Sequence, residues 1–174
     1  MDQTYNRVFF EPTDRRKAAK IINNKYTTYF ASPNLAELRA MAQSLGLLQR
    51  VNVTSNEVIE ILKLSSIVSR FIKCMVVTMG SKGVITINSQ ERDISARFYP
   101  TVPIDIIENV SGAGDCFASG FIHGMLMGLE ESQSMFVGFQ AAKMALLSRK
   151  TVPSNLYSLN SLSFEEAKYE IINL

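Results

Sequence analysis

The stretch Ser111-Gly112-Ala113-Gly114-Asp115 constrains this chain most, because it puts almost no side chain at the start of an apolar helical pattern. With little side chain in the way, backbone N–H groups of the turn and of the helix N-terminus can face an anion. Asp115, in the first helical turn, could accept a proton from a hydroxyl beside a phosphoryl group. The stretch therefore indicates phosphoryl transfer. The apolar pattern that follows it consists of Phe117, Phe121, Ile122, Met125, Leu126 and Leu129.

The same residues also have a purely structural interpretation. In it the glycines tighten a loop before a helix, and Asp115 stabilises the helix dipole. Short glycine patterns are common in proteins, so this stretch alone does not separate the two interpretations.

Two further motifs precede this stretch. Asn34 and Glu37 stand where an apolar strand pattern gives way to a helical one, and taken alone they are an N-cap and its capping-box partner. Thr78, Gly80 and Gly83 occupy a turn between two apolar strands, which alone is typical of an ordinary hairpin. Taken singly, neither motif separates a structural from a functional interpretation.

In this order the motifs resemble those of the PfkB (ribokinase-like) carbohydrate kinases. The resemblance implies that Asp115 is the catalytic base, which would deprotonate the hydroxyl that attacks the ATP γ-phosphate. It further implies that Gly112, Ala113 and Gly114 hold the charge developing on the transferred group. Asn34 would organise Mg²⁺ and the phosphates together with Glu37 and ordered water. ATP and Mg²⁺ are thus the implied cofactors.

The same resemblance implies a nucleotide site. Contacts to the nucleotide phosphates would come from Thr78, Gly80 and Gly83. Val102 and Ile104 would lie near the adenine, although taken alone they fit an edge-strand connector equally well. Asn109 stands where potassium-dependent members of the family have an Asp, which puts a monovalent-cation site in doubt. The segment 148–154 departs from the family's Gly-Ala turn, so base contacts there do not transfer.

A finer resemblance concerns the acceptor. The segments 10–14, 17–20 and 29–34 resemble the pseudouridine kinase branch, including the kinase half of bifunctional pseudouridine-metabolising proteins. The implied substrate is a small-molecule sugar or nucleoside, with pseudouridine favoured. A non-catalytic nucleotide-binding or assembly module is the main alternative. A Rossmann-like cofactor domain is disfavoured, because no Gly-x-Gly-x-x-Gly follows the first strand.

Composition narrows the class of protein. With 174 residues, 47% of them hydrophobic, the chain can bury one sizeable core, and a net charge of +2 indicates neither nucleic acid nor an anionic membrane as partner. The sequence has no run of eighteen apolar residues and no signal-peptide pattern, which predicts a cytoplasmic protein with a mitochondrial location left open. His123, the only histidine, excludes a histidine triad within one chain.

Length implies a partial domain. A full PfkB kinase is substantially longer, so residues 1–174 correspond to a single partial PfkB domain that lacks the N-terminal half and the lid. We expect an α/β fold, the C-terminal portion of a three-layer αβα sandwich, whose mostly parallel sheet has an antiparallel hairpin at its edge. An exposed edge strand then predicts a homo-oligomer, pairing with an N-terminal kinase half, or aggregation.

Periodicity and capping residues predict the individual elements. Residues 15–17 and Lys20 are interpreted as a solvated helix face rather than a phosphate patch. Ser55 is expected to cap the third helix, and Ser163 to cap a last helix over 164–172. The expected strands are 7–10, 28–31, 74–79, 84–88 and 94–99, and the expected helices are 13–24, 34–46, 55–71, one starting at 115, 132–147 and 164–172.

Overall fold

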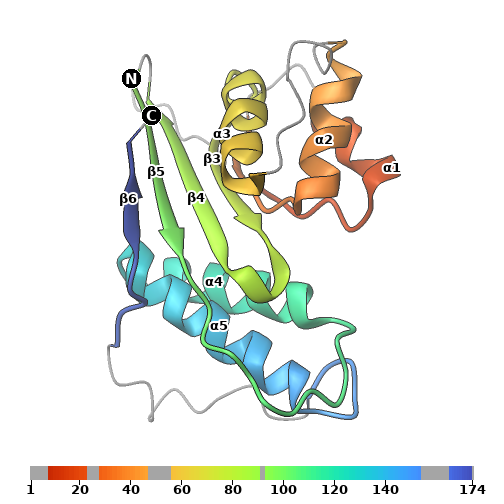
Figure 1. Cartoon of the computed structure of the whole chain (residues 1–174), viewed down its shortest axis with the longest axis vertical. Coiled ribbons are helices and arrows are strands. Elements are labelled where there is room, and N and C mark those ends of the chain that lie inside the picture. The colour runs from red at the N-terminus through yellow and green to blue at the C-terminus, as the bar shows by residue number, and fades with distance from the viewer. Residues whose placement is uncertain (1–7, 23–27, 47–55, 91–92, 154–164, 174) are drawn as a thin grey trace. The chain divides into compact units, whose positions relative to one another are not determined.

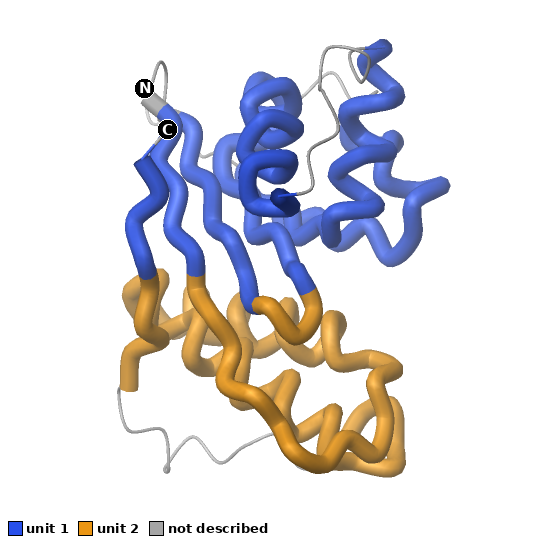
Figure 2. Tube along the Cα trace, viewed as in Figure 1, with its two compact units in different colours: residues 1–79, 83–98, 170–174 blue, residues 80–82, 99–169 orange. Residues whose placement is uncertain are grey.

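The computed structural model describes residues 8–22, 28–46, 56–90, 93–153 and 165–173. The chain divides into two compact units (Figure 2). The first comprises residues 1–79, 83–98 and 170–174, and the second comprises residues 80–82 and 99–169.

The described residues form a mixed sheet with the strand order β1-β2-β3-β4-β5-β6. Figure 1 shows β3, β4, β5 and β6 of this sheet. Strands β1, β2 and β3 run parallel, whereas β3 with β4 and β5 with β6 are antiparallel. The α/β class, with a parallel part and an antiparallel hairpin beyond it, is confirmed. The strands are β1 Phe9–Phe10, β2 Thr28–Ala31, β3 Ile72–Thr78, β4 Val84–Gln90, β5 Asp93–Tyr99 and β6 Glu170–Ile172.

Helices connect the parallel strands, because parallel neighbours require a crossover. Between β1 and β2 lie α1 (Arg15–Ala18) and the 3₁₀ helix η1 (Ala19–Ile21). Between β2 and β3 lie α2 (Leu35–Ser44) and α3 (Glu57–Val68), which pack against each other. The core of this unit is aliphatic and fully enclosed, and it includes Leu38, Met41, Ile61, Leu64, Val68, Met75, Val77, Ile85 and Ile87.

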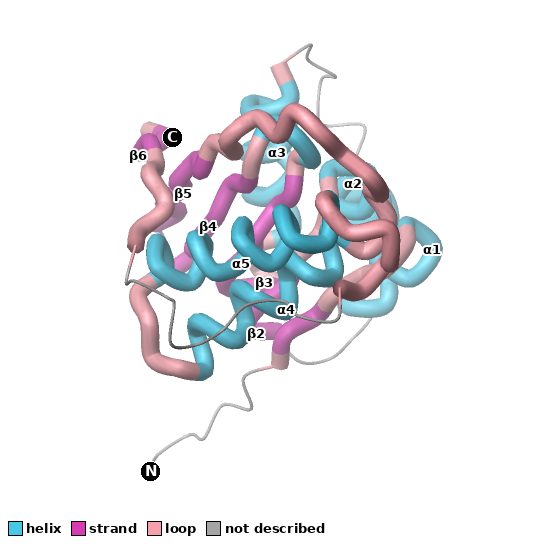
Figure 3. Tube along the Cα trace, turned by 90° about the horizontal axis from the view of Figure 1, so that it is seen from below, coloured by secondary structure: helices cyan, strands magenta, loops and turns pink. Residues whose placement is uncertain are grey.

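The second unit contains the 3₁₀ helix η3 (Gly80–Lys82) and the helices α4 (Ala113–Leu126) and α5 (Glu131–Leu146), which lie side by side (Figure 3). Three glycines, Gly120, Gly124 and Gly138, allow this close approach. A Cβ on Gly120 would lie 2.8 Å from the Val137 carbonyl oxygen, and one on Gly138 would lie 2.9 Å from the Phe117 ring. No helix in the described ranges is long and apolar enough to span a bilayer.

Two predictions of local structure were wrong. The expected last helix is absent over its described part, because residues 165–169 have no regular structure and β6 pairs with β5 instead. Pairing satisfies the backbone at the open edge of β5, which outweighs the local helix propensity of this segment. The cap of α3 is Asn56, whose side chain accepts hydrogen bonds from the N–H groups of Val58 and Ile59. Ser55, Ser163 and Phe164 lie outside the described residues.

Candidate active site

Helix α4 begins at a glycine whose conformation and surroundings both exclude a side chain. Gly112 is the N-cap residue, with φ +79°, and it provides no side-chain cap. A Cβ at this position would lie 2.6 Å from the carbonyl oxygen of Thr151 and 2.7 Å from its Cγ2. The Cys116 N–H donates to the Gly112 carbonyl over 2.9 Å, which starts the helical hydrogen bonding. The first N–H groups of α4 are therefore left without a capping side chain.

Gly114 is a glycine that packing does not explain. It lies in the first turn of α4 and is exposed, and a Cβ built on it would meet nothing within 4 Å. Asp115 follows it and is also exposed. Alanine stabilises a helix relative to glycine, so the presence of glycine rather than alanine at position 114 needs a reason other than helix stability. Open access to the backbone is such a reason, because a ligand can then approach the N–H groups closely.

The loop before α4 is tied to the end of α5. The N–H groups of Glu108 and Asn109 donate to the carbonyl of Leu146 over 2.9 and 3.3 Å. The side-chain oxygen of Asn109 accepts the N–H of Ser111 at 2.9 Å. These bonds fix the backbone that leads into Gly112.

Cys116, buried just behind Asp115, takes no part in this exposed surface. Burial, and secondly the nearby charge of Asp115, raise the pKa of the Cys116 thiol. A raised pKa keeps the thiol protonated near neutral pH, where it is a poor nucleophile. We therefore treat Cys116 as part of the packing between α4 and α5.

In the first unit, Asn34 and Glu37 form a complete capping box at the start of α2. The Glu37 N–H donates to Asn34 Oδ1 over 3.0 Å, and the Asn34 N–H donates to Glu37 Oε2 over 2.8 Å. Asn34 is exposed, whereas Glu37 is only 3% exposed. A β-bridge joins Asn34 to Thr78, and the Thr78 N–H donates to the Pro33 carbonyl over 3.1 Å. Two of the three motifs thus meet at the carboxyl ends of β2 and β3.

The glycines after Thr78 form a tight turn. Gly80 and Gly83 have φ values of +60° and +126°, and the Met79 N–H donates to the Gly83 carbonyl over 2.9 Å. Gly80 is exposed, and a Cβ on it would meet nothing within 4 Å. The positive φ is therefore the structural reason for a glycine at this position. Thr78 and Gly83 belong to the first unit, and Gly80 belongs to the second.

The expected adenine-side residues lie in the irregular segment after β5. Val102 is 83% exposed and Ile104 is partly buried. The Thr101 hydroxyl donates to the Ser81 carbonyl at 2.5 Å, which ties this segment to η3. Sequence reasoning missed Thr151, whose backbone packs against Gly112, because no residue pattern reports a main-chain contact.

The described side chains could hold a magnesium ion only if phosphate oxygens and water supplied most of its ligands. The described residues contain no group of three or more His, Cys, Asp or Glu side chains that could hold a metal. Mg²⁺ usually takes one or two carboxylates and keeps several waters or substrate phosphates as ligands. Glu37 is 3% exposed and its Oε2 accepts the Asn34 N–H, so any contact between this side chain and such an ion would run through an ordered water.

The sequence was compared with families of known proteins. Residues 2–156 match the family described as pfkB family carbohydrate kinase. The chain belongs to this family. A pseudouridine kinase from Arabidopsis thaliana is 26% identical, over 84% of this chain and 51% of the relative.

Solved structures of several kinases share the fold of this chain. A putative sugar kinase from Clostridium perfringens matches with a TM-score of 0.71 and 17% identity, over 94% of this chain and 48% of that one. The adenosine kinase from Sinorhizobium meliloti matches with a TM-score of 0.66 and 16% identity, over 84% of this chain and 41% of that one. Ribokinase from Cryptococcus neoformans, in complex with ADP, matches with a TM-score of 0.64 and 19% identity, over 83% of this chain and 48% of that one. The chain spans about half the length of these relatives.

Proposed function

We propose that this chain is the nucleotide-binding and catalytic part of a PfkB kinase, which transfers the γ-phosphate of ATP to a hydroxyl of a sugar or nucleoside. Family membership supports the reaction class. The observation that carries the proposal is the bare, open first turn of α4, where Gly114 has no packing reason to be a glycine and Asp115 is exposed beside it.

The geometry of the α4 turn fits this chemistry. The N–H groups that follow Gly112 carry no side-chain cap, so they are available to hold negative charge on a phosphoryl group in transfer. Asp115 would hold the proton of the attacking hydroxyl. Asn34 and Glu37 would position Mg²⁺ and phosphate oxygens through water. When bound, ATP and Mg²⁺ supply the phosphoryl group and neutralise part of its charge.

For the acceptor we propose pseudouridine. The support is the similarity to the pseudouridine kinase of Arabidopsis thaliana at 26% identity, together with the segments near the N-terminus noted above. Because the chain spans about half of that relative, we propose that the other half of the domain supplies most contacts to the acceptor, and that it packs along β1 at the sheet edge.

The test is ATP-dependent phosphorylation of pseudouridine, with ribose, adenosine and uridine as comparison acceptors. It is run with this chain alone and with this chain joined to the missing half of the domain. We expect turnover only when both halves are present, and a loss of about a hundredfold or more in Asp115→Asn with ATP affinity largely kept. ATP binding without turnover on any acceptor would instead favour a non-catalytic nucleotide-binding module.

A further inference from the structure

The loop between β1 and α1 contains two locally unfavourable features. Thr13 is the one non-glycine residue in the described ranges with a positive φ, at +61°. The first turn of α1 carries Arg15, Arg16 and Lys17 and no acidic residue. A β-branched residue in the left-handed region is a genuine outlier, and the free N–H groups of a helix start favour acids over bases. Such departures from local preference concentrate at functional sites.

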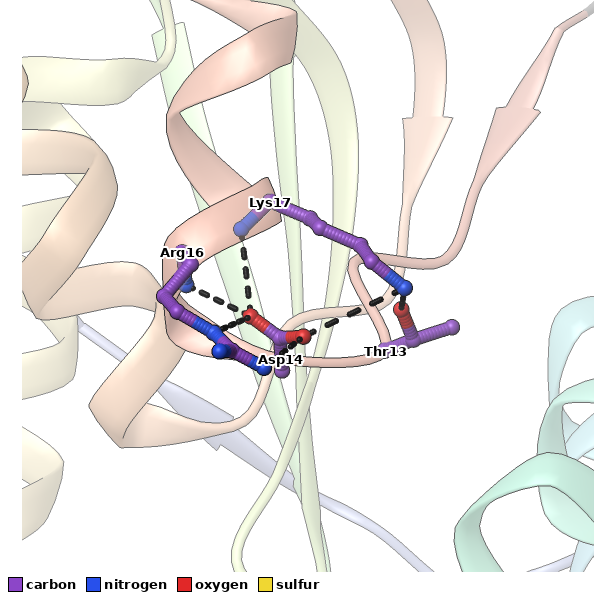
Figure 4. A network of polar contacts seen from close by, with 4 residues as sticks. All are labelled: Thr13, Asp14, Arg16 and Lys17. Atoms are coloured by element: carbon purple, nitrogen blue, oxygen red, sulfur yellow. Dashed lines mark hydrogen bonds and ion pairs between the residues drawn. The ribbon is translucent and has the colours of Figure 1, made fainter.

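Asp14 organises the basic residues around this loop (Figure 4). Its Oδ1 accepts the N–H groups of Arg16 and Lys17 at 2.7 and 3.3 Å, which caps α1. The Arg16 guanidinium lies 3.4 Å from the same carboxylate. Hydrogen bonding from the Arg16 side chain is the main reason why the pKa of Asp14 is lowered. Asp14 therefore stays charged as it holds the two cations.

The Lys17 side chain runs back toward the loop (Figure 4). Its Nζ lies 3.3 Å from Thr13 Oγ1 and 3.9 Å from Asp14 Oδ2. The unusual backbone of Thr13 thus presents the hydroxyl that anchors this ammonium. A lysine ammonium has three N–H donors, and the Lys17 side chain is 55% exposed, so it retains capacity for a further acceptor.

The position of this loop in the sheet is the third observation. The Ser32 N–H donates to the Phe10 carbonyl over 3.0 Å, so the chain leaves β1 beside the segment that leads to Asn34. Asn34 in turn bridges to Thr78. The loop of Lys17 and the two motifs therefore follow the carboxyl ends of three adjacent parallel strands. Open α/β sheets bind their ligands outside this edge.

We propose that Lys17 binds a phosphate group at the carboxyl edge of the sheet, and that Thr13 and Asp14 position its ammonium for this purpose. The inference rests on the proposed function. The ligand is a phosphate dianion, either the terminal phosphate of the nucleotide or the phosphate ester of the product. The expected solvated helix face is confirmed, because Arg15, Arg16, Lys17 and Lys20 are all exposed, and the proposal adds a ligand-binding role for Lys17 on that face.

The test compares Lys17→Met with Lys20→Met, a matched control on the adjoining 3₁₀ helix. Calorimetric titration of the whole chain with MgATP, MgADP and ribose 5-phosphate separates the two sources of phosphate. We expect Lys17→Met to weaken binding about tenfold or more, and Lys20→Met to leave it unchanged. Loss confined to MgATP identifies the γ-phosphate, loss for both MgATP and MgADP identifies a phosphate that the two nucleotides share, and loss confined to ribose 5-phosphate identifies the product ester.

A second variant keeps the lysine. Thr13→Gly relieves the left-handed backbone and removes the anchoring hydroxyl, so we expect a higher melting temperature and weaker phosphate binding together. If wild type binds MgATP and Lys17→Met binds all three ligands equally well, the Lys17 site is overturned while the proposed function stands. If wild type binds none of the three ligands, both proposals fail.

Discussion

At the scale of single residues, Gly114 and Gly120 lie on the same helix and are glycines for different reasons. A Cβ on Gly120 would come within 2.8 Å of the Val137 carbonyl oxygen, so we expect Gly120→Ala to destabilise the fold by about 1–3 kcal/mol. A Cβ on Gly114 meets nothing, and alanine there should stabilise α4 by up to about 1 kcal/mol. We nevertheless expect Gly114→Ala to slow phosphoryl transfer by about a hundredfold, because the added methyl group blocks the anion-binding N–H groups.

Thermal unfolding and transfer rates, measured on both variants in the complete domain, check this prediction. The combination of higher stability with lower activity would identify Gly114 as functional. Full activity in Gly114→Ala would remove the anion hole from the proposed mechanism and leave the structural interpretation of the glycine turn.

At the scale of helices, α2 and α3 are joined by a partly buried ion pair. Arg39 donates from Nε and Nη2 to the two carboxylate oxygens of Glu60, both at 2.7 Å, and Glu60 is only 4% exposed. Hydrogen bonding from Arg39 outweighs burial and lowers the pKa of Glu60. A lowered folded-state pKa gives stability that is present above the ordinary glutamate pKa and is lost as pH falls through the lowered value.

We expect Glu60→Gln to reduce the free energy of unfolding by about 1–2 kcal/mol at neutral pH, a value kept small because Arg39 is half exposed. The loss should shrink as the pH falls below the ordinary glutamate pKa and through the lowered pKa of folded Glu60, because wild type then loses the pair as well. Urea unfolding at several pH values measures it. Glu108→Gln, which breaks an exposed pair with Arg149, is the control and should change stability by less than about 1 kcal/mol. An equal loss at every pH would show that Glu60 acts through packing alone.

The elements also show how far the sequence predicts the fold. Helix α2 was predictable because Asn34 and Glu37 carry its capping box locally, and β3 because a continuous apolar run marks a buried strand. Strand β6 was not, because its partner β5 is distant in sequence and its own residues favour a helix. The positive φ of Thr13 arises from the path of the loop between β1 and α1, which no local residue pattern predicts. The contact between Lys17 Nζ and Thr13 Oγ1 was therefore not predictable from the sequence. The roles of the site residues in catalysis remain predictions.

At the scale of the whole molecule, β1 is the edge of the described sheet. The Phe30 and Ser32 N–H groups donate to the carbonyls of Val8 and Phe10, so the N–H and carbonyl of the intervening Phe9 face away from β2. Val8 is 53% exposed. Unpaired edges of this kind recruit another strand, either from a second copy of the chain or from the part of a PfkB domain that the longer relatives contain and this chain does not match.

We expect the isolated chain to self-associate with rising concentration, and Val8→Lys to suppress this association, because a lysine on an edge strand opposes strand addition. Ile59→Lys, an exposed apolar residue on α3, is the matched control and should leave association unchanged. Sedimentation velocity over a range of concentrations measures the effect. The proposed other half of the domain, when added, should replace self-association with a one-to-one complex that wild type forms more tightly than Val8→Lys does. A wild-type chain that stays monomeric alone and does not bind the other half would show that β1 does not recruit a partner strand.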